Sequence, residues 1–341
     1  MVKRDILNFT LLELRGEMKR IGEPPYRAKQ IFYWLYKKGL KNFGEMSNMP
    51  QFLKNKLEEN YSRGTLDLTE RLKSSDGTEK FLFKLKDGSF IESVLIYSGE
   101  RKTVCLSTQV GCRYRCAFCA SGLRGFVRNL DTSEILNQIS FLGHNLKHKI
   151  TNFVFMGMGE PLDNYENVSR SILIMTSPEG MGIAAKRITV STCGIIPGIK
   201  ALRTLKIGIN LSVSLHAADD SLRNSLMPIN KKYPIIELMK ACADFAEKAK
   251  GDVTFEYVLI KGKNDSAEDA EKLAKLANRL DAKINLLVYS PVPQFALKPP
   301  TESDIKTFIK TLESKKAKVT LRRSKGADIA AACGQLAGRQ V

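Results

Sequence analysis

The sequence predicts an α/β fold whose main part is a parallel sheet, preceded by a smaller region of helices and an antiparallel meander. From about residue 100, strand-like and helix-like stretches alternate, which is typical of parallel strands joined by crossover helices. Before that point, helical periodicity comes first and strand periodicity follows it. The parallel part forms either an open sheet or a barrel.

The chain is expected to be helical up to about residue 60. In "PPYRAKQIFYWLYKKGL", Ile31, Trp34 and Leu35 recur at helical spacing, and the pattern stops at Gly39. The stretch "SSDGTEKFLFKLKDGSFIESVLIYS" then alternates apolar and polar residues and contains two Asp-Gly pairs. Such pairs are typical of hairpin turns, so an antiparallel meander is predicted there.

Strands and helices of the parallel part follow from their periodicity. Asp131 and Glu134 form a predicted capping box in front of the first helix. The predicted strands are 103–107, 150–156, 187–191, 209–215, 253–260 and 284–290, and the predicted helices are 132–146, 165–175, 234–249 and 266–280. In parallel barrels the chemistry gathers at the carboxyl ends of the strands. Polar or cysteine-containing turns follow the first four strands here, namely "GCRYRCAFC", "GMGEP", "STCG" and "SLHA".

Composition narrows the class of protein. The opening 20 residues are charged and no run of 18 apolar residues occurs, so a membrane span and a signal peptide are not expected and the predicted location is the cytoplasm. Seven unevenly spaced cysteines favour metal or redox chemistry over a disulfide framework. The net charge of +18 predicts a polyanionic partner, with nucleic acid as the leading candidate.

The stretch "GCRYRCAFCASG" holds Cys112, Cys116 and Cys119. A structural zinc site needs four ligands, and no fourth cysteine lies near these three. Three cysteines on an iron–sulfur cube leave one iron without a protein ligand, and that iron is free to accept donor atoms of a substrate. The incomplete ligand set therefore favours an iron–sulfur site over a closed zinc site.

The spacing Cys-x3-Cys-x2-Cys, with Phe118 before the last cysteine, resembles the radical S-adenosylmethionine (SAM) superfamily. The resemblance implies a 4Fe–4S cluster on the three cysteines and SAM chelated to the open iron, where an electron breaks the sulfonium to give a 5′-deoxyadenosyl radical. It also implies a partial (β/α)6 TIM-like barrel. The expected organisation is an accessory, RNA-binding region at 1–97, the radical SAM barrel at 98–320 and a carboxyl-terminal segment at 321–341.

The same resemblance implies the SAM contacts. They come from "FMGMGEP", "VSTCG", "SLH" and the end of the sixth strand, where Ser290 stands in place of the Asn that relatives usually carry. A hydroxyl at that position still hydrogen-bonds. The expected contact residues are Gly159, Glu160, Ser191, Ser214, Leu215, His216 and Ser290.

Further motifs resemble the RlmN/Cfr family of RNA adenine methyltransferases: "VCLSTQVGCRYRCAFCASG", "FMGMGEPL", "LMPINKKYPI", "DVTFEYVLIKGKNDS" and "VTLRRSKGADIAAACGQLAG". The resemblance implies methylation of C2 of adenosine in 23S rRNA and in tRNA. By it, Cys333 accepts a methyl group from one SAM, a second SAM supplies the radical, and Cys105 resolves the adduct by a transient disulfide. Glu92 corresponds to the proposed proton acceptor.

Two alternatives stay open. A Cfr-type enzyme methylates C8 of the same ribosomal adenosine and shares all five functional cysteines, although "FMGMGEPL" and "STCG" look more like the C2 enzymes. A zinc-bearing RNA-binding protein without catalysis is the second. The remaining expectations are a monomer, no membrane, and an external electron donor such as flavodoxin or ferredoxin. For Cys193 and Cys242, packing is the only role predicted.

Overall fold

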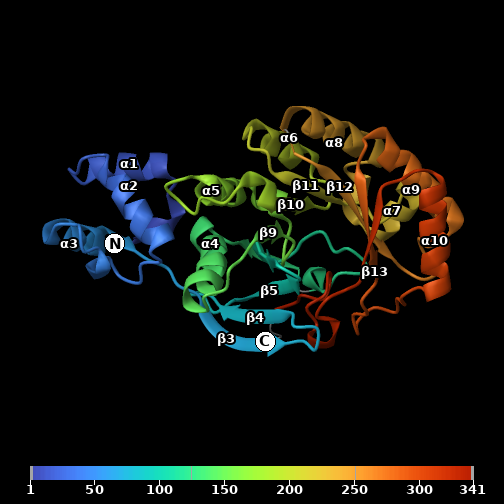
Figure 1. Cartoon of the computed structure of the whole chain (residues 1–341), viewed down its shortest axis with the longest axis horizontal. Helices are drawn as coiled ribbons and strands as arrows, with labels where there is room; N and C mark the ends of the chain where they lie inside the picture. The colour runs from blue at the N-terminus through green and yellow to red at the C-terminus, as the bar shows by residue number, and fades with distance from the viewer. Residues whose placement is uncertain (1–2, 124, 250, 339–341) are drawn as a thin grey trace. The chain divides into compact units, whose positions relative to one another are not determined.

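The computed structural model describes residues 3–123, 125–249 and 251–338 (Figure 1). The chain divides into two compact units. Unit 1 comprises residues 1–67, 130–150 and 166–184, and unit 2 comprises 68–129, 151–165 and 185–341. The meander belongs to the same unit as the parallel strands, whereas the sequence predicts a boundary after residue 97.

Unit 1 is helical, as predicted for the first part of the chain. The Thr10 side chain caps the first helix and Glu13 completes the capping box. A wider turn, with Lys38 N donating to Tyr33 O, continues the second helix to Gly39, whose φ of 66° suits glycine. The helices of this unit are α1 (Leu11–Arg20), α2 (Arg27–Phe32), α3 (Gln51–Asn60), α4 (Thr132–Ser140) and most of α5 (Tyr165–Thr176).

Unit 1 contains one pair of strands that the sequence does not predict, and one predicted capping box. Short strands β1 (Arg4–Asp5) and β2 (Tyr61–Ser62) pair in parallel. The predicted capping box at Asp131 and Glu134 is present at the start of α4, so this prediction is confirmed. Helix α4 contributes Ile135 and Leu136 to the buried core.

Unit 2 is built on one continuous sheet. Its strand order is β14-β13-β12-β11-β10-β9-β6-β5-β4-β3, so it has two edges and forms an open, partial barrel rather than a closed one. The strands are β3 (Asp67–Lys73), β4 (Glu79–Lys84), β5 (Phe90–Ser98), β6 (Arg101–Cys105), β9 (Asn152–Phe155), β10 (Ile188–Thr192), β11 (Asn210–Ser214), β12 (Val253–Leu259), β13 (Lys283–Val288) and β14 (Val319–Arg322).

The sheet has an antiparallel and a parallel half. Strands β4, β5 and β6 pair antiparallel, and the positive φ angles of Gly77 and Gly88 fit the two predicted Asp-Gly turns. From β6 to β14 every neighbouring pair is parallel. Strands β6, β9, β10, β11, β12 and β13 are the six that the sequence predicts.

Crossover helices accompany the parallel strands, as Figure 1 shows for α6 to α10. Their bounds are α6 (Ile196–Thr204), α7 (Asp220–Leu226), α8 (Ile235–Ala249), α9 (Ala267–Arg279) and α10 (Glu302–Ser314). Strand β12 is buried on both faces along most of its length, as expected when helices cover a parallel sheet. No helix among the described residues is long and apolar enough to cross a membrane.

Candidate active site

Cys112, Cys116 and Cys119 lie in one loop, the cysteine loop, of a small hairpin that follows β6. Strands β7 (Gln109–Gly111) and β8 (Phe126–Asn129) pair antiparallel, and the loop runs between them. Gly111 has a φ of 74°, and a Cβ there would lie 1.9 Å from the Gly125 carbonyl oxygen. Cys112 N donates to the same oxygen at 3.0 Å. Only glycine therefore fits the position in front of the first cysteine.

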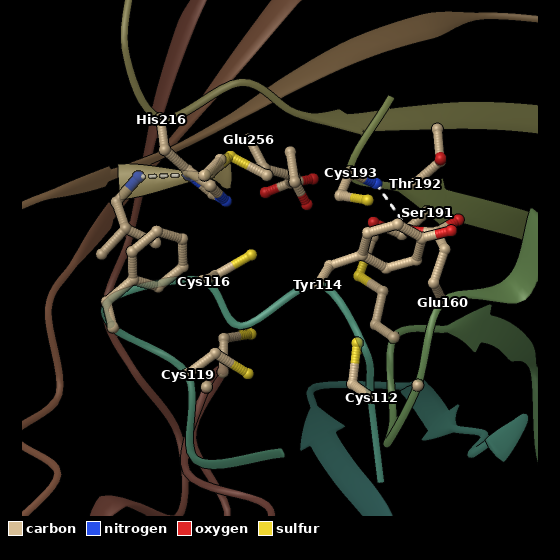
Figure 2. A pocket seen from close by; sticks show the side chains of 18 of the residues that line it. Cys112, Tyr114, Cys116, Cys119, Glu160, Ser191, Thr192, Cys193, His216 and Glu256 are labelled. Atoms are coloured by element: carbon tan, nitrogen blue, oxygen red, sulfur yellow. Dashed lines mark hydrogen bonds between the residues drawn. The ribbon is translucent and has the colours of Figure 1, made fainter. Parts of the chain in front are cut away.

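The three cysteines of the loop line one cavity of about 950 Å³, a volume that includes its opening to solvent. Figure 2 shows the side chains of Cys112, Cys116 and Cys119 around it. Burial raises the pKa of all three thiols, that of Cys112 to about 12, and for Cys112 and Cys116 the neighbouring thiols raise it further. Three thiolates in one buried wall need compensating positive charge, which the iron of a cluster supplies. The three loop cysteines therefore fit an iron–sulfur cluster.

Across the cavity, the turn after β9 presents Gly159 and Glu160. Gly159 has a φ of 94°, and a Cβ would lie 2.4 Å from Cβ of Gln109. The Glu160 carboxylate accepts hydrogen bonds from Cys193 N at 2.7 Å and from Leu162 N at 3.0 Å. Burial raises its pKa, and these hydrogen bonds oppose the rise. The carboxylate is thereby fixed in the cavity wall.

The next two strands contribute Ser191, Ser214 and His216 to the same wall. Burial, followed by the charge of Arg223, lowers the pKa of His216 to about 3, so the imidazole is neutral at physiological pH. Its Nδ1 accepts a hydrogen bond of 3.1 Å from Val258 N. This bond leaves Nε2 as the protonated nitrogen of the ring.

Leu215 and Ser290 do not line the cavity among the described residues, although both are buried. Ser214 and His216, on either side of Leu215 in the sequence, line the cavity, and so does Tyr289, directly before Ser290. Of the seven expected SAM-contact residues, five thus share one wall.

Cys333 lines this cavity as well, although it is far from the loop in sequence. The residue as a whole is exposed, but desolvation of its thiol at the cavity and the Glu256 carboxylate raise its pKa to about 11. Cys105, at the end of β6, is buried and its pKa is also raised, first by burial and then by the charge of Cys333. The charge of Cys333 therefore acts on Cys105, although Cys105 is not among the described residues that line the cavity.

Hydrogen bonds from the cysteine loop hold the segment around Cys333. Ala120 N donates to the Gly334 carbonyl oxygen at 2.7 Å, and the Ser121 hydroxyl donates to the Leu336 carbonyl oxygen at 2.6 Å. The loop and the carboxyl-terminal segment are thus joined by one main-chain and one side-chain hydrogen bond, both shortly after Cys333 in the sequence.

Glu92 also holds the carboxyl-terminal segment. Its Oε2 accepts hydrogen bonds of 2.9 Å from Ala337 N and from Gly338 N. Lys80 forms an ion pair of 3.0 Å with Oε1. Glu92 is buried and, among the described residues, does not belong to the set that lines the cavity.

Several cavity residues were not predicted from the sequence. The Glu256 carboxylate accepts hydrogen bonds from the Ser212 hydroxyl at 2.6 Å and from Asn285 Nδ2 at 2.9 Å, which fixes it in the wall. Cys193 lines the cavity too, whereas Cys242 is fully buried in α8, as its packing role predicts. Tyr114 also lines the cavity, and its place in the sequence between Cys112 and Cys116 could have indicated this.

Comparison with known proteins decides the family. Residues 106–277 match the radical SAM superfamily, and residues 4–62 match a ribosomal RNA large subunit methyltransferase N-terminal domain. A probable dual-specificity RNA methyltransferase RlmN of Clostridium botulinum (strain Eklund 17B / Type B) is 46% identical over 334 residues, which cover 98% of this chain and 96% of that protein. The chain belongs to the RlmN family.

Other RlmN relatives are similar over the same extent. The dual-specificity RNA methyltransferase RlmN of Geotalea uraniireducens is 42% identical over 339 residues, covering 99% of this chain and 98% of that protein. The crystal structure of a radical SAM methyltransferase from Sphaerobacter thermophilus has a TM-score of 0.92 and 41% identity, and the match covers 98% of this chain and 99% of that one.

Membership of the RlmN family confirms the predicted radical SAM fold and the predicted class of enzyme, a SAM-dependent radical methyltransferase. A 4Fe–4S cluster and SAM follow from the superfamily. The alternative of a non-catalytic, zinc-bearing RNA-binding protein is not supported.

Proposed function

We propose that the chain methylates C2 of adenosine in 23S rRNA and in tRNA by way of a methyl group carried on Cys333. One observation carries the proposal: Cys333 lines the same cavity as the three loop cysteines. The names of the RlmN relatives support RNA as the substrate. Carbon 2 of adenine is electron-poor and cannot attack a sulfonium, so a carbon radical suits it better than polar transfer.

When bound, the cluster and SAM supply an activated methyl group and a radical that removes hydrogen, with two SAM molecules used per turnover. The chain's own residues then have separate tasks. The Cys333 thiolate takes the methyl group by displacement, which requires loss of the thiol proton. Gly159, Glu160, Ser191, Ser214 and His216 are proposed to hold SAM, with Leu215 and Ser290 acting through the backbone.

Cys105 completes the cycle. Addition of the methylene radical to C2 leaves an adduct that must first lose the ring proton and its unpaired electron, the electron passing to the external electron carrier. The Cys105 thiolate then attacks the Cys333 sulfur. The bond between that sulfur and the methylene carbon breaks, its electron pair stays with the carbon, and the carbon takes up a proton. A disulfide between Cys105 and Cys333 remains, and an external reductant restores both thiols.

Glu92 is proposed as the acceptor of the ring proton. Both of its carboxylate oxygens are engaged, one by Lys80 and the other by the backbone of residues 337–338. Proton transfer to Glu92 therefore requires the carboxyl-terminal segment to shift first. This requirement couples loss of the ring proton to movement of the segment that carries Cys333.

RNA is proposed to bind through basic side chains of the helical region and of the cysteine loop, which attract its phosphates. The target base must leave its stack to reach the cavity. Some of these cations already have acidic partners: Arg113 pairs with Asp163 at 2.9 Å, and Lys29 with Glu179 at 3.2 Å. Arg124 of the loop lies outside the described residues. The protein is further proposed to be a monomer in the cytoplasm that receives electrons from flavodoxin or ferredoxin.

Anaerobic reconstitution with iron and sulfide, followed by nucleoside analysis, tests the proposal. The reconstituted enzyme, SAM and a reductant are incubated with 23S rRNA fragments and tRNA, and the digested RNA is analysed by mass spectrometry. We expect 2-methyladenosine, and none with the C333A variant as the matched control. Formation of 8-methyladenosine, or of product by C333A, would overturn the proposal.

A further inference from the structure

Arg223 in α7 is completely buried, with 0% of the residue exposed. Its guanidinium donates hydrogen bonds to three main-chain carbonyl oxygens: those of Leu215 at 3.0 Å, Cys193 at 2.7 Å and Ser214 at 3.2 Å. A fourth bond, of 2.8 Å, goes to Asn230 Oδ1. All four acceptors are neutral, so the hydrogen bonds satisfy the guanidinium without cancelling its charge.

No carboxylate forms an ion pair with Arg223 among the described residues. Asp220 lies on the same helix, and it is the carboxylate whose charge acts most on Arg223. The Oδ1 atom of Asp220, however, accepts hydrogen bonds from Ile235 N and Asn230 Nδ2. A buried charge without a partner is costly. Neutral donors would satisfy the same carbonyls, so these hydrogen bonds alone do not account for a cation at this position.

The position of α7 places this cation behind the wall of the cavity. The Leu226 carbonyl oxygen of α7 accepts a hydrogen bond of 2.9 Å from Ala117 N, directly after Cys116. Two of the residues whose carbonyls Arg223 holds, Cys193 and Ser214, line the cavity with Cys116. The guanidinium is therefore fixed between the cysteine loop and the ends of two strands, and its charge acts on the Cys116 thiol.

We propose that Arg223 is a buried cation that raises the reduction potential of the cluster while it fixes the ends of β10 and β11. The inference rests on the proposed cluster site. The reduced form of a cluster carries one more negative charge than the oxidised form, so a nearby fixed positive charge stabilises the reduced form. Low local polarity strengthens this interaction, because little solvent separates the charge from the cluster.

The test is a redox titration of the reconstituted full-length protein, followed by electron paramagnetic resonance, without RNA. The variants are R223Q and R223K. R223Q removes the charge and keeps a hydrogen-bonding side chain, whereas R223K keeps the charge and loses the planar guanidinium with its several donors. At the wild-type midpoint we expect the ratio of reduced to oxidised cluster to fall about tenfold in R223Q, equivalent to about 59 mV for one electron. In R223K the ratio of reduced to oxidised cluster should stay within about twofold of the wild-type ratio.

A second variant keeps the test decisive if R223Q does not retain its cluster. D220N removes the acidic charge beside Arg223 and leaves an amide oxygen for Ile235 N and Asn230, so it should raise the potential. An unchanged potential in R223Q or in D220N would overturn the inference. Wild-type protein that binds no iron–sulfur cluster would instead contradict the proposed function, so the two failures are distinguishable.

Discussion

Lys80 and Glu92 form an ion pair of 3.0 Å on neighbouring strands β4 and β5, with only 11% and 7% of the two side chains exposed. Both ends of the pair also contact the carboxyl-terminal segment. Lys80 Nζ donates to the Ala330 carbonyl oxygen at 3.2 Å, and Glu92 accepts from the backbone of residues 337–338. The meander thus holds the chain on both sides of Cys333.

Separate variants of this pair distinguish anchoring from proton transfer. K80M leaves Glu92 buried and unpaired, so we expect a loss of about 3 kcal/mol of stability and slower methylation of Cys333. E92Q still accepts the backbone hydrogen bonds through its amide oxygen, so methylation of Cys333 should persist while product forms at least tenfold more slowly. Mass spectrometry of the intact protein and of RNA nucleosides measures the two steps. Unchanged product formation by E92Q would remove Glu92 as proton acceptor.

The C105S variant should stop the proposed reaction at the covalent adduct. Without the attacking thiolate, the bond between the Cys333 sulfur and the methylene carbon persists, and we expect a covalent protein–RNA adduct to accumulate. Denaturing electrophoresis with labelled RNA detects the adduct as a shifted band. The double variant C105S/C333A has no carbon carrier and serves as the control. Turnover by C105S at the wild-type rate would exclude Cys105 as the resolving residue.

Gly159 is constrained both by its φ of 94° and by Gln109, which a Cβ would approach to 2.4 Å. G159A should therefore cost about 1–3 kcal/mol from backbone strain, with a further steric cost, and should weaken SAM binding. The matched control is G77A, whose φ is 87° but whose Cβ would meet no atom within 4 Å. Urea unfolding and calorimetric titration with SAM compare the two. Equal effects of G159A and G77A on SAM binding would contradict a role for the turn.

Asp76 links the meander to the carboxyl-terminal segment in a pH-dependent way. Partial burial alone would raise its pKa, but hydrogen bonds from Thr78 and from Gly326 N outweigh this and lower it from 3.8 to about 2. A lowered folded-state pKa means that the stabilisation is complete above about pH 4 and is lost as the pH falls toward 2.

We therefore expect D76N to lower the melting temperature by roughly 1–2 °C at pH 7. The difference from wild type should disappear between about pH 4 and pH 2, because the protonated carboxyl of Asp76 and the amide of the variant are then both uncharged. Thermal unfolding across this range measures it. A difference that stays constant down to pH 2 would show that the carboxylate charge contributes nothing.

The basic face of the helical region is testable by charge reversal. Lys37 and Lys38 have no acidic partner among the described residues, so K37E/K38E should weaken RNA binding and flatten its dependence on salt. Lys315 and Lys318, which pair with Glu271 and Asp281, provide the control variant K315E/K318E. Filter binding of tRNA at several salt concentrations measures both. Equal salt dependence in the two double variants would exclude this surface.

Much of the fold could be predicted because its signals are local. Hydrophobic periodicity identifies the six parallel strands, and the Asp-Gly pairs identify the turns of the meander. Strand β14 was missed: only four residues long, it alternates partly buried with exposed side chains and lacks the apolar run of a central strand. Helix α6 was missed as well, since the Pro near its first residue and a glycine directly after it weaken the helical pattern.

The candidate site divides in the same way. By itself the sequence determined the three loop cysteines and the glycine turn after β9, because their spacing is local and limits the possible chemistry. Only the tertiary structure decided that Cys333 faces the loop cysteines, that Glu92 holds a segment 245 residues away, and that Arg223 lies uncompensated behind the wall. Such contacts depend on how distant strands pair and pack, and no local pattern of residues encodes that pairing.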